Sequence, residues 1–189
     1  MQLRIIKLLF LSSFLIGIFL LIKPIYFYSK GYMMQYFLSE SWNEYRINRN
    51  MKYDWFNLQP IGKLTVPRLQ ISNIILDGSD NRILAYGLGK IENNTLIHES
   101  MQNIAIAGHR DSYFKDLKNI VVNDEVLLEH IEGTSKYRVE KTIIVSPEEI
   151  DYIKKNKKNT LTLITCFPFN FIGNAPKRFI VQCKLVQEL

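Results

Sequence analysis

The N-terminal part of the chain differs in pattern from all that follows. Leu8–Ile22 is apolar apart from Ser12, Ser13 and Gly17, and extending the run back to Ile5 gives 18 residues. As a helix this run measures roughly 27 Å, close to the ~30 Å hydrocarbon core of a bilayer. A buried helix of a soluble domain is seldom so long and so uniformly apolar. The pattern therefore predicts a transmembrane helix.

We interpret residues 1–30 as an uncleaved signal anchor. A cleaved signal peptide needs small residues at its cleavage site, whereas bulky residues follow the run here, over 23–28. The aromatic side chains among them, together with Tyr32, are typical of a membrane interface. Two basic residues lie on each side of the run, so the orientation is inferred from its place at the start of the chain. That place favours a cytoplasmic N-terminus.

Residues 31–56 contain no proline and predict a helical linker. Apolar residues recur there at intervals of about three or four, which gives the helix one apolar face. That face comprises Tyr32, Gln35 or Tyr36, Leu38, Trp42 and Tyr45. The helix is either a free stalk or packs on the domain predicted for residues 57–189.

Short apolar runs separated by turn signals fill the chain from Ile61 onwards. The runs are 62–66, 71–76, 104–107, 126–131, 137–145, 161–166 and 179–185. Turn-forming residues stand between them, including Asp77-Gly78, Gly87-Leu88-Gly89, Asn93-Asn94, Glu132-Gly133 and Gly173-Asn174. Several short strands with this spacing predict an all-β barrel or sandwich.

One helix is expected to interrupt these strands. Ser146, Pro147 and Glu149 form a capping-box pattern with proline at the first helical position. The helix would continue through 150–153 and end within 154–158, where lysines suit the negative end of a helix dipole.

The charge of the chain gives little support to a nucleic-acid partner. The formal net charge is +6, but residues 1–30 hold four bases and no acid, leaving 20 bases against 18 acids in the remainder. The positive charge thus belongs mainly to the membrane segment. A hydrophobic content of 47% predicts a packed domain rather than a disordered chain.

Two cysteines offer a thiol, and the strand pattern separates them. Cys166 ends its run just before Phe167-Pro168, because proline cannot continue a central strand, and strand ends often carry catalytic side chains. Cys183 alternates with Val181 and Leu185 on an apolar face and is interpreted as a core residue. A disulfide between the two cysteines is the alternative, but it would cap the proposed nucleophile.

A cysteine nucleophile needs an imidazole partner and a donor for developing negative charge. His109 follows the buried-type run 104–107 into a turn, and residues 111–117 after it predict a short helical turn capped by Asp111. Arg178 opens the last run after an intervening loop over 167–177. The other two histidines, His98 and His130, lie outside any motif.

No metal site and no cofactor are predicted. The histidines and cysteines show no paired ligand spacing such as C-x-x-C or H-E-x-x-H. The glycines of Gly87-Leu88-Gly89 lack the strand–helix context of a phosphate-binding loop.

Together these motifs resemble the sortases, the membrane-anchored cysteine transpeptidases of bacteria. The resemblance covers roughly residues 61–186 and rests on Leu64–Leu69, Ala107–Phe114 and Thr160–Cys166. Phe167-Pro168-Phe169 and Ala175–Val181 are most similar to class D, whereas Ile75–Gly78 and Leu84–Gly89 are similar to a Gram-negative subgroup. One departure is Asn123-Asp124, where many relatives have Gly-Asp.

The resemblance implies an eight-stranded β-barrel with one or two short helices behind the transmembrane helix. It implies Cys166 as the nucleophile, His109 as the acid/base and Arg178 as the stabiliser of oxyanion and substrate. The substrate would be a protein with a C-terminal Leu-Pro-x-Thr-Gly-like sorting signal, cleaved after Thr through a thioacyl enzyme. The acceptor would be an amine of a cell-wall precursor or a protein lysine. The domain would lie outside the cytoplasm on a single-pass membrane anchor.

Two other functions remain open from the sequence. A cysteine hydrolase would let water resolve the same thioester and release surface proteins. A non-catalytic anchored β-domain would hold a peptide partner without cutting it. The role of a sortase also remains open among protein anchoring, pilus assembly and service to one dedicated substrate.

Overall fold

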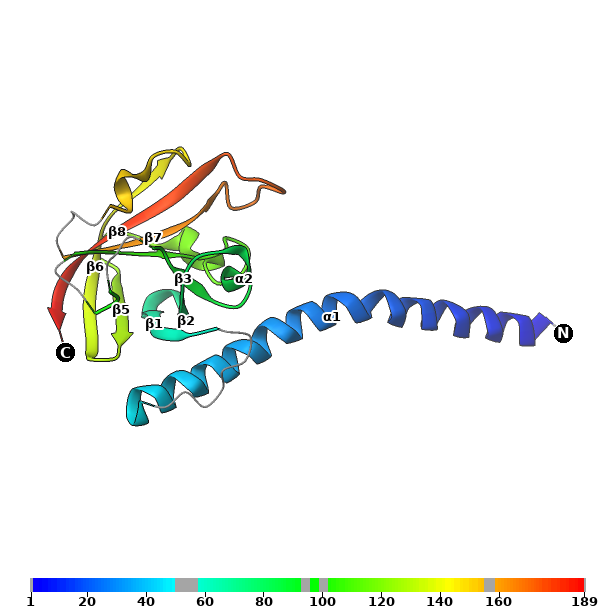
Figure 1. Ribbon diagram of the computed structural model, residues 1–189. Coiled ribbons are helices and arrows are strands. Elements are labelled where there is room, and N and C mark those ends of the chain that lie inside the picture. The colour runs from blue at the N-terminus through cyan, green and yellow to red at the C-terminus, as the bar shows by residue number, and fades with distance from the viewer. Residues whose placement is uncertain (1, 50–57, 93–95, 99–101, 155–158, 189) are drawn as a thin grey trace.

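A long helix leads into a closed β-barrel in the computed structural model, which describes residues 2–49, 58–92, 96–98, 102–154 and 159–188 (Figure 1). The strands are, in order around the barrel, β1 (Pro60–Val66), β2 (Ile71–Asp77), β3 (Leu88–Lys90), β4 (Asn103–Ala107), β7 (Thr160–Phe167), β8 (Lys177–Glu188), β6 (Gly133–Val145) and β5 (Glu125–His130). The β2–β3 and β4–β7 pairs are parallel and the other pairs are antiparallel. The predicted eight-stranded all-β barrel is confirmed.

Alternation along the strands fills the barrel with apolar side chains. In β7, Leu161 and Leu163 are fully buried in the interior, where they meet Ile104 and Ile106 of β4. The intervening residues of both strands point to the outer face. Cys166 therefore lies on the outside of the barrel, on the same face as Ile164.

Seven of the eight strands match predicted runs, and most extend beyond them by one to four residues. The exception is β3, because Gly87-Leu88-Gly89 had the composition of a turn. An added Cβ at Gly89 would lie 2.5 Å from the carbonyl oxygen of Gly78. Glycine is present there because the neighbouring backbone comes too close for any side chain, and this close packing lets a very short strand complete the barrel.

The predicted helix after Ser146 is wrong: only the short 3-10 helix η3 (Ile150–Tyr152) forms. The Glu149 carboxylate does accept a hydrogen bond from the Ser146 backbone N–H, at 3.0 Å, as a capping box requires. The Asn103 amide, however, donates to the carbonyls of Tyr152 and Lys154 at 2.8 and 3.1 Å. Contacts to the barrel thus replace helical bonding. Residues 155–158 of the predicted helix end lie outside the described part.

Other short helices occupy the connections between strands. α2 (Asn81–Leu84) was not predicted. Its N-cap is Asp80, whose carboxylate accepts hydrogen bonds from two backbone N–H groups. η1 (Pro67–Leu69) follows β1. The turn expected over 111–117 forms η2 (Lys115–Asn119). It begins later than expected and no side chain caps it, so the predicted capping role of Asp111 is wrong.

The helix α1 (Gln2–Asn48) runs without a break from the apolar segment to the barrel, on which its C-terminal half packs. Met34, Leu38 and Trp42 are buried against β2 and neighbouring residues. The Gln35 side chain accepts from the Ile74 backbone N–H at 3.2 Å and donates to the Tyr86 carbonyl. The second half of α1 therefore packs on the domain and is no free stalk. Tyr36, expected on the apolar face, is exposed.

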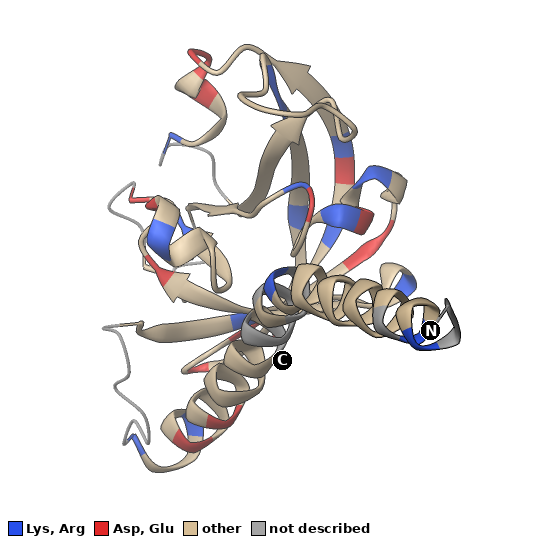
Figure 2. Cartoon of the chain, turned by 90° about the vertical axis from the view of Figure 1, so that its right-hand side faces the viewer, with Lys and Arg blue, Asp and Glu red and all other residues tan. Residues whose placement is uncertain are grey.

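The N-terminal half of α1 is long and apolar enough to cross a membrane. Arg4–Lys23 comprises 20 residues, and an 18-residue window within it has a mean hydropathy of 2.7 and no buried side chain among those described. All acidic residues of the helix lie in its barrel-bound half, so red is absent from the projecting half in Figure 2. The side chains of Phe27, Tyr28 and Tyr32, expected at the membrane interface, lie outside the described part, and the linker residues 50–57 do so entirely.

Candidate active site

Cys166 and Arg178 are direct cross-strand partners in the antiparallel β7–β8 pair. Residues opposite each other in such a pair project from the same face with Cβ atoms about 4.5–5.5 Å apart. Both side chains are partly accessible to solvent. The register therefore brings the predicted thiol and the predicted guanidinium to one place on the outer face of the barrel.

His109 reaches this place from the other side of β7. Strand β4 is parallel to β7 with Ala107 opposite Ile164, and the Gly108 N–H donates to the Ile164 carbonyl at 3.1 Å. Continuing this register places His109 at the level of Cys166. The Thr165 hydroxyl donates to the Gly108 carbonyl at 2.7 Å and holds the two strand ends together. The three residues predicted from the sequence thus lie at neighbouring ends of β4, β7 and β8.

The turn that carries His109 is fixed by the core. Phe114 is fully buried in the barrel, and its N–H donates to the His109 carbonyl at 3.0 Å. A Cβ on Gly108 would lie 2.7 Å from the Phe114 ring and 2.6 Å from Leu88. Only glycine permits this close approach. Within the described residues no hydrogen bond joins His109 to Cys166, a common state in substrate-free sites, where such bonds tighten on substrate binding.

The loop between β7 and β8 is held by two arginines from opposite sides. Arg178 Nη1 donates to the carbonyls of Ala175 and Lys177 at 3.2 and 3.1 Å. Arg110 Nη2 donates to the carbonyls of Phe171 and Gly173, the latter at 3.0 Å. The Arg110 guanidinium also lies over the Phe171 ring, 5.9 Å from its centroid. Sequence reasoning missed this role of Arg110, whose only signal was its place beside His109.

A buried apolar cluster, here called the apolar patch, packs on the outer face of the barrel beside Cys166. It is formed by Ala105 of β4, Ile164 of β7, and Ile180 and Val145 of β8 and β6. Partly buried neighbours complete it: Ile91, Ile143, Tyr152 and Ile153. Tyr152 and Ile153 belong to the β6–β7 connection, which Asn103 holds against the sheet. This connection therefore covers part of the patch, whose four central residues are buried.

Cys183 and His130 are buried residues of the barrel and lie away from the candidate active site, as their sequence contexts suggested. Cys183 is only 1% exposed inside the barrel, and burial raises the pKa of its thiol. Both cysteines are free, so no disulfide caps Cys166. His130 is buried and bonded to Ser135 at 3.0 Å, and burial lowers its pKa. His98 lies 3.8 Å from the Glu132 carboxylate, apart from these strand ends.

Asn123-Asp124, which stands where many sortases have Gly-Asp, has a structural role in its turn. Asn123 adopts a left-handed backbone conformation (φ 74°), which asparagine tolerates better than most residues. The buried Asp124 carboxylate accepts a two-pronged hydrogen bond from Arg68, at 2.5 and 2.6 Å, and one from the Val121 N–H at 2.8 Å. Hydrogen bonding from Arg68 holds the pKa of Asp124 below its usual value.

Comparison with known proteins agrees with this architecture. A model of the sortase domain matches residues 64–186. Sortase D of Bacillus subtilis (strain 168) is 33% identical over 129 residues, a match that covers 68% of this chain and 65% of that protein. The chain thus spans just under two thirds of that relative's length.

Solved structures show the same fold. A Clostridium perfringens sortase D5 transpeptidase superimposes with a TM-score of 0.67 at 22% identity, over 82% of this chain and 99% of that one. Sortase C-1 of Actinomyces oris gives 0.62 at 27% identity, over 68% and 75%. The resemblance to class D is supported by the 33% identity to sortase D of Bacillus subtilis. The domain match, the identity to sortase D and the shared barrel together place this chain in the sortase family of cysteine transpeptidases.

Proposed function

We propose that this protein is a membrane-anchored transpeptidase that cleaves a Leu-Pro-x-Thr-like sorting signal and joins the new carboxyl terminus to an amine. The observation that carries the proposal is the cross-strand pairing of Cys166 with Arg178, with His109 at the adjacent end of β4. A thiol, an imidazole and a guanidinium on one accessible face are the groups that acyl transfer through a thioester requires.

In the first half-reaction the Cys166 thiolate attacks the threonine carbonyl carbon of the signal. The carbonyl oxygen becomes an oxyanion, to which Arg178 donates hydrogen bonds. The His109 imidazolium gives its proton to the departing amine as the C–N bond breaks. The products are a thioacyl enzyme, neutral His109 and the C-terminal fragment of the substrate.

In the second half-reaction an amine resolves the thioester. Neutral His109 takes a proton from the incoming amine, whose nitrogen attacks the acyl carbon. The C–S bond breaks, an amide forms, and Cys166 leaves as a thiolate beside the regenerated imidazolium.

The apolar patch beside Cys166 supports a signal with apolar residues before the scissile bond. Ile164 lies two residues before Cys166 on the same face and pairs with Ile180. Ile164, Ile180 and Ala105 are themselves buried, so the Leu-Pro part of a bound peptide would contact the partly buried members of the patch, Ile91, Ile143, Tyr152 and Ile153, while its threonine carbonyl reaches the thiol. Such patches bind extended peptides through a few apolar side chains.

The N-terminal helix supports a single-pass anchor with the barrel outside the cytoplasm. The 20 residues of Arg4–Lys23 span about 30 Å as a helix, and none is covered by the barrel. A membrane-impermeant thiol reagent applied to intact cells should modify Cys166. Modification only after the cells are lysed would show that the barrel faces the cytoplasm.

A peptide assay tests the reaction and separates transpeptidase from hydrolase. The full chain in detergent is incubated with a Leu-Pro-x-Thr-Gly peptide, with and without an added amine such as triglycine. Transpeptidation predicts a peptide joined to the amine as the main product, and a Cys166→Ala variant predicts neither product. A free threonine carboxylate as the main product, unchanged by amine, would indicate a hydrolase.

A further inference from the structure

The tip of the β7–β8 loop presents apolar side chains to solvent. Ile172 is 96% exposed and Phe171 43%. No charged residue occurs from Phe167 to Pro176. Both residues lie in the connection between β7 and β8 rather than on a strand.

The loop is held so that its tip cannot fold back. Arg110 binds the carbonyls on both sides of Ile172, those of Phe171 and Gly173, and Arg178 binds the carbonyl of Ala175. The Phe171 N–H donates to the Pro168 carbonyl at 3.3 Å. The backbone around Ile172 is therefore fixed from beneath, and its side chain points away from the domain.

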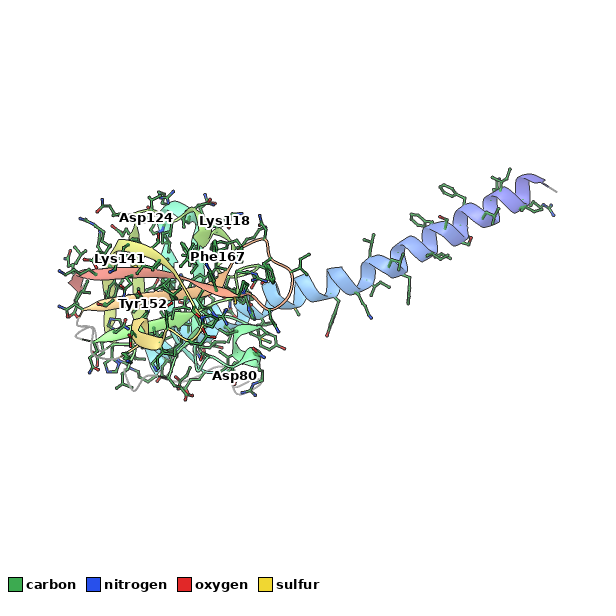
Figure 3. All side chains as sticks on the ribbon, turned by 90° about the horizontal axis from the view of Figure 1, so that it is seen from above. Asp80, Lys118, Asp124, Lys141, Tyr152 and Phe167 are labelled. Atoms are coloured by element: carbon green, nitrogen blue, oxygen red, sulfur yellow. The ribbon has the colours of Figure 1, made fainter. Side chains whose placement is uncertain are left out.

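The tip faces the side of the barrel on which the membrane segment projects. Figure 1 and Figure 3, at right angles to each other, both show this loop as the part of the barrel that reaches furthest along the direction of the N-terminal half of α1. The packing of Met34, Leu38 and Trp42 and the Gln35 hydrogen bonds fix the helix on the barrel, so the direction is set by the fold.

The helix is also short enough to keep the barrel near the lipid. Of the described side chains, Met34 is the buried docking residue nearest the span, and it lies 11 residues from Lys23, about 16 Å along a helix. The headgroup region adds roughly 5–8 Å beyond the hydrocarbon on each side. The docking residue therefore lies about 8–11 Å outside the headgroups, a gap that the part of the barrel reaching furthest towards the membrane would have to cover.

We propose that Phe171 and Ile172 insert into the membrane interface as a second, lipid-facing contact beside the α1 anchor. The contact would fix the rotation of the barrel so that the strand ends holding Cys166, His109 and Arg178 face the membrane surface. The proposal rests on the proposed membrane anchor but not on catalysis. Phe171 and Ile172 are apolar, and the Arg110 guanidinium beside them is engaged by the Phe171 ring and two backbone carbonyls, so the contact would depend mainly on apolar burial rather than on anionic lipid.

Site-directed fluorescence on the full chain tests this contact. In a Cys166→Ala background the buried Cys183 stays unlabelled, and Ile172→Cys is labelled with an environment-sensitive dye in phosphatidylcholine nanodiscs. Lipids carrying a headgroup-level nitroxide should quench this dye at least threefold more than one at Val186→Cys. Val186 is 49% exposed near the opposite, C-terminal end of the molecule. Added anionic lipid or salt should change the ratio little.

The controls separate the proposal from its premises. A dye at Phe14→Cys reports whether α1 is inserted, and the Cys166→Ala background removes catalysis from the readout. With Phe14 quenched, equal quenching at positions 172 and 186 would overturn the proposal. A dye at 172 that ignores lipid but responds to a sorting-signal peptide would also overturn it, by showing that the tip contacts substrate.

Discussion

Cys166 of β7 and Arg178 of β8 stand opposite each other as a cross-strand pair at the strand ends that flank the apolar outer patch. This relationship predicts that the guanidinium acts on the acyl group bound to the thiol. Because the pair is set by sheet register, the backbone places the donor beside the thiol before substrate arrives.

Arg178→Lys keeps the positive charge and tests whether that is sufficient. A planar guanidinium donates two aligned hydrogen bonds, whereas an ammonium is a mobile point charge. We expect kcat/KM for the signal peptide to fall about 100- to 1,000-fold. Lys177→Arg is the matched control, since Lys177 is exposed and pairs with Phe167 rather than Cys166. Near-normal turnover by Arg178→Lys would remove Arg178 from this role.

The two thiols should differ sharply in reactivity. Cys166 is accessible, whereas Cys183 is buried and burial raises its pKa, so it remains a protonated thiol. Iodoacetamide should modify one cysteine of the native protein, Cys166, and both after denaturation, as read by peptide mass spectrometry. Modification of Cys183 in the native protein at a comparable rate contradicts the core assignment.

Cys183→Ser tests the same assignment through stability. The serine hydroxyl would enter an apolar interior without a designed partner, at a cost of about 1–3 kcal/mol in the free energy of unfolding. Peptide turnover per folded molecule should stay near wild type. A fall in turnover with unchanged stability would instead show that Cys183 takes part in the chemistry.

Much of the fold was predicted from the hydrophobic pattern along the chain, and each wrong prediction has a structural reason. Alternation placed Cys183 on a core face, and it is buried inside the barrel. β3 was not predicted because it has only three residues, and one of them, Gly89, is needed for the close approach of the Gly78 backbone. The helix predicted after Ser146 does not form, because Asn103, distant in sequence, donates hydrogen bonds to the carbonyls that helical turns would use.

The site was predicted in part. Strand ends pointed to Cys166, His109 and Arg178, but their mutual placement depends on β4 lying beside β7, a long-range pairing that no local pattern shows. Arg110 was missed for the same reason: its partners, Phe171 and Gly173, lie some sixty residues away and are backbone carbonyls. Backbone acceptors carry no sequence signature.

The docking of α1 on the barrel should depend on one buried side chain. Trp42 is fully buried against Leu58, Ile74 and neighbours, so Trp42→Ala should cost about 3–5 kcal/mol. Trp42→Phe is the control: the indole Nε1 has no hydrogen-bond partner among the described residues, so replacing it loses little beyond volume. Thermal unfolding and protease sensitivity of the full chain in detergent measure both. Equal stability of the two variants would mean that this contact does not hold the helix.

The Arg68–Asp124 pair predicts a pH-dependent contribution to stability. The pKa of Asp124 is lower in the folded than in the unfolded protein, because Arg68 bonds the carboxylate. Its contribution is therefore complete above the unfolded value near 3.9 and is lost as the pH falls through the folded value. Asp124→Asn should lower the unfolding midpoint at pH 7, and this difference from wild type should shrink below about pH 4. A difference independent of pH would argue against the ion pair.

The most direct test of the account is the covalent intermediate on Cys166. The full chain in detergent is mixed with a Leu-Pro-x-Thr-Gly peptide without amine, quenched in acid and analysed by intact and peptide mass spectrometry. The account predicts a mass increase equal to the acyl fragment ending in Thr, carried by the peptide that contains Cys166, removed by hydroxylamine and missing from Cys166→Ala. A folded wild-type protein that never acquires this adduct with any Leu-Pro-x-Thr-like peptide, or acquires it elsewhere, would contradict the central claim.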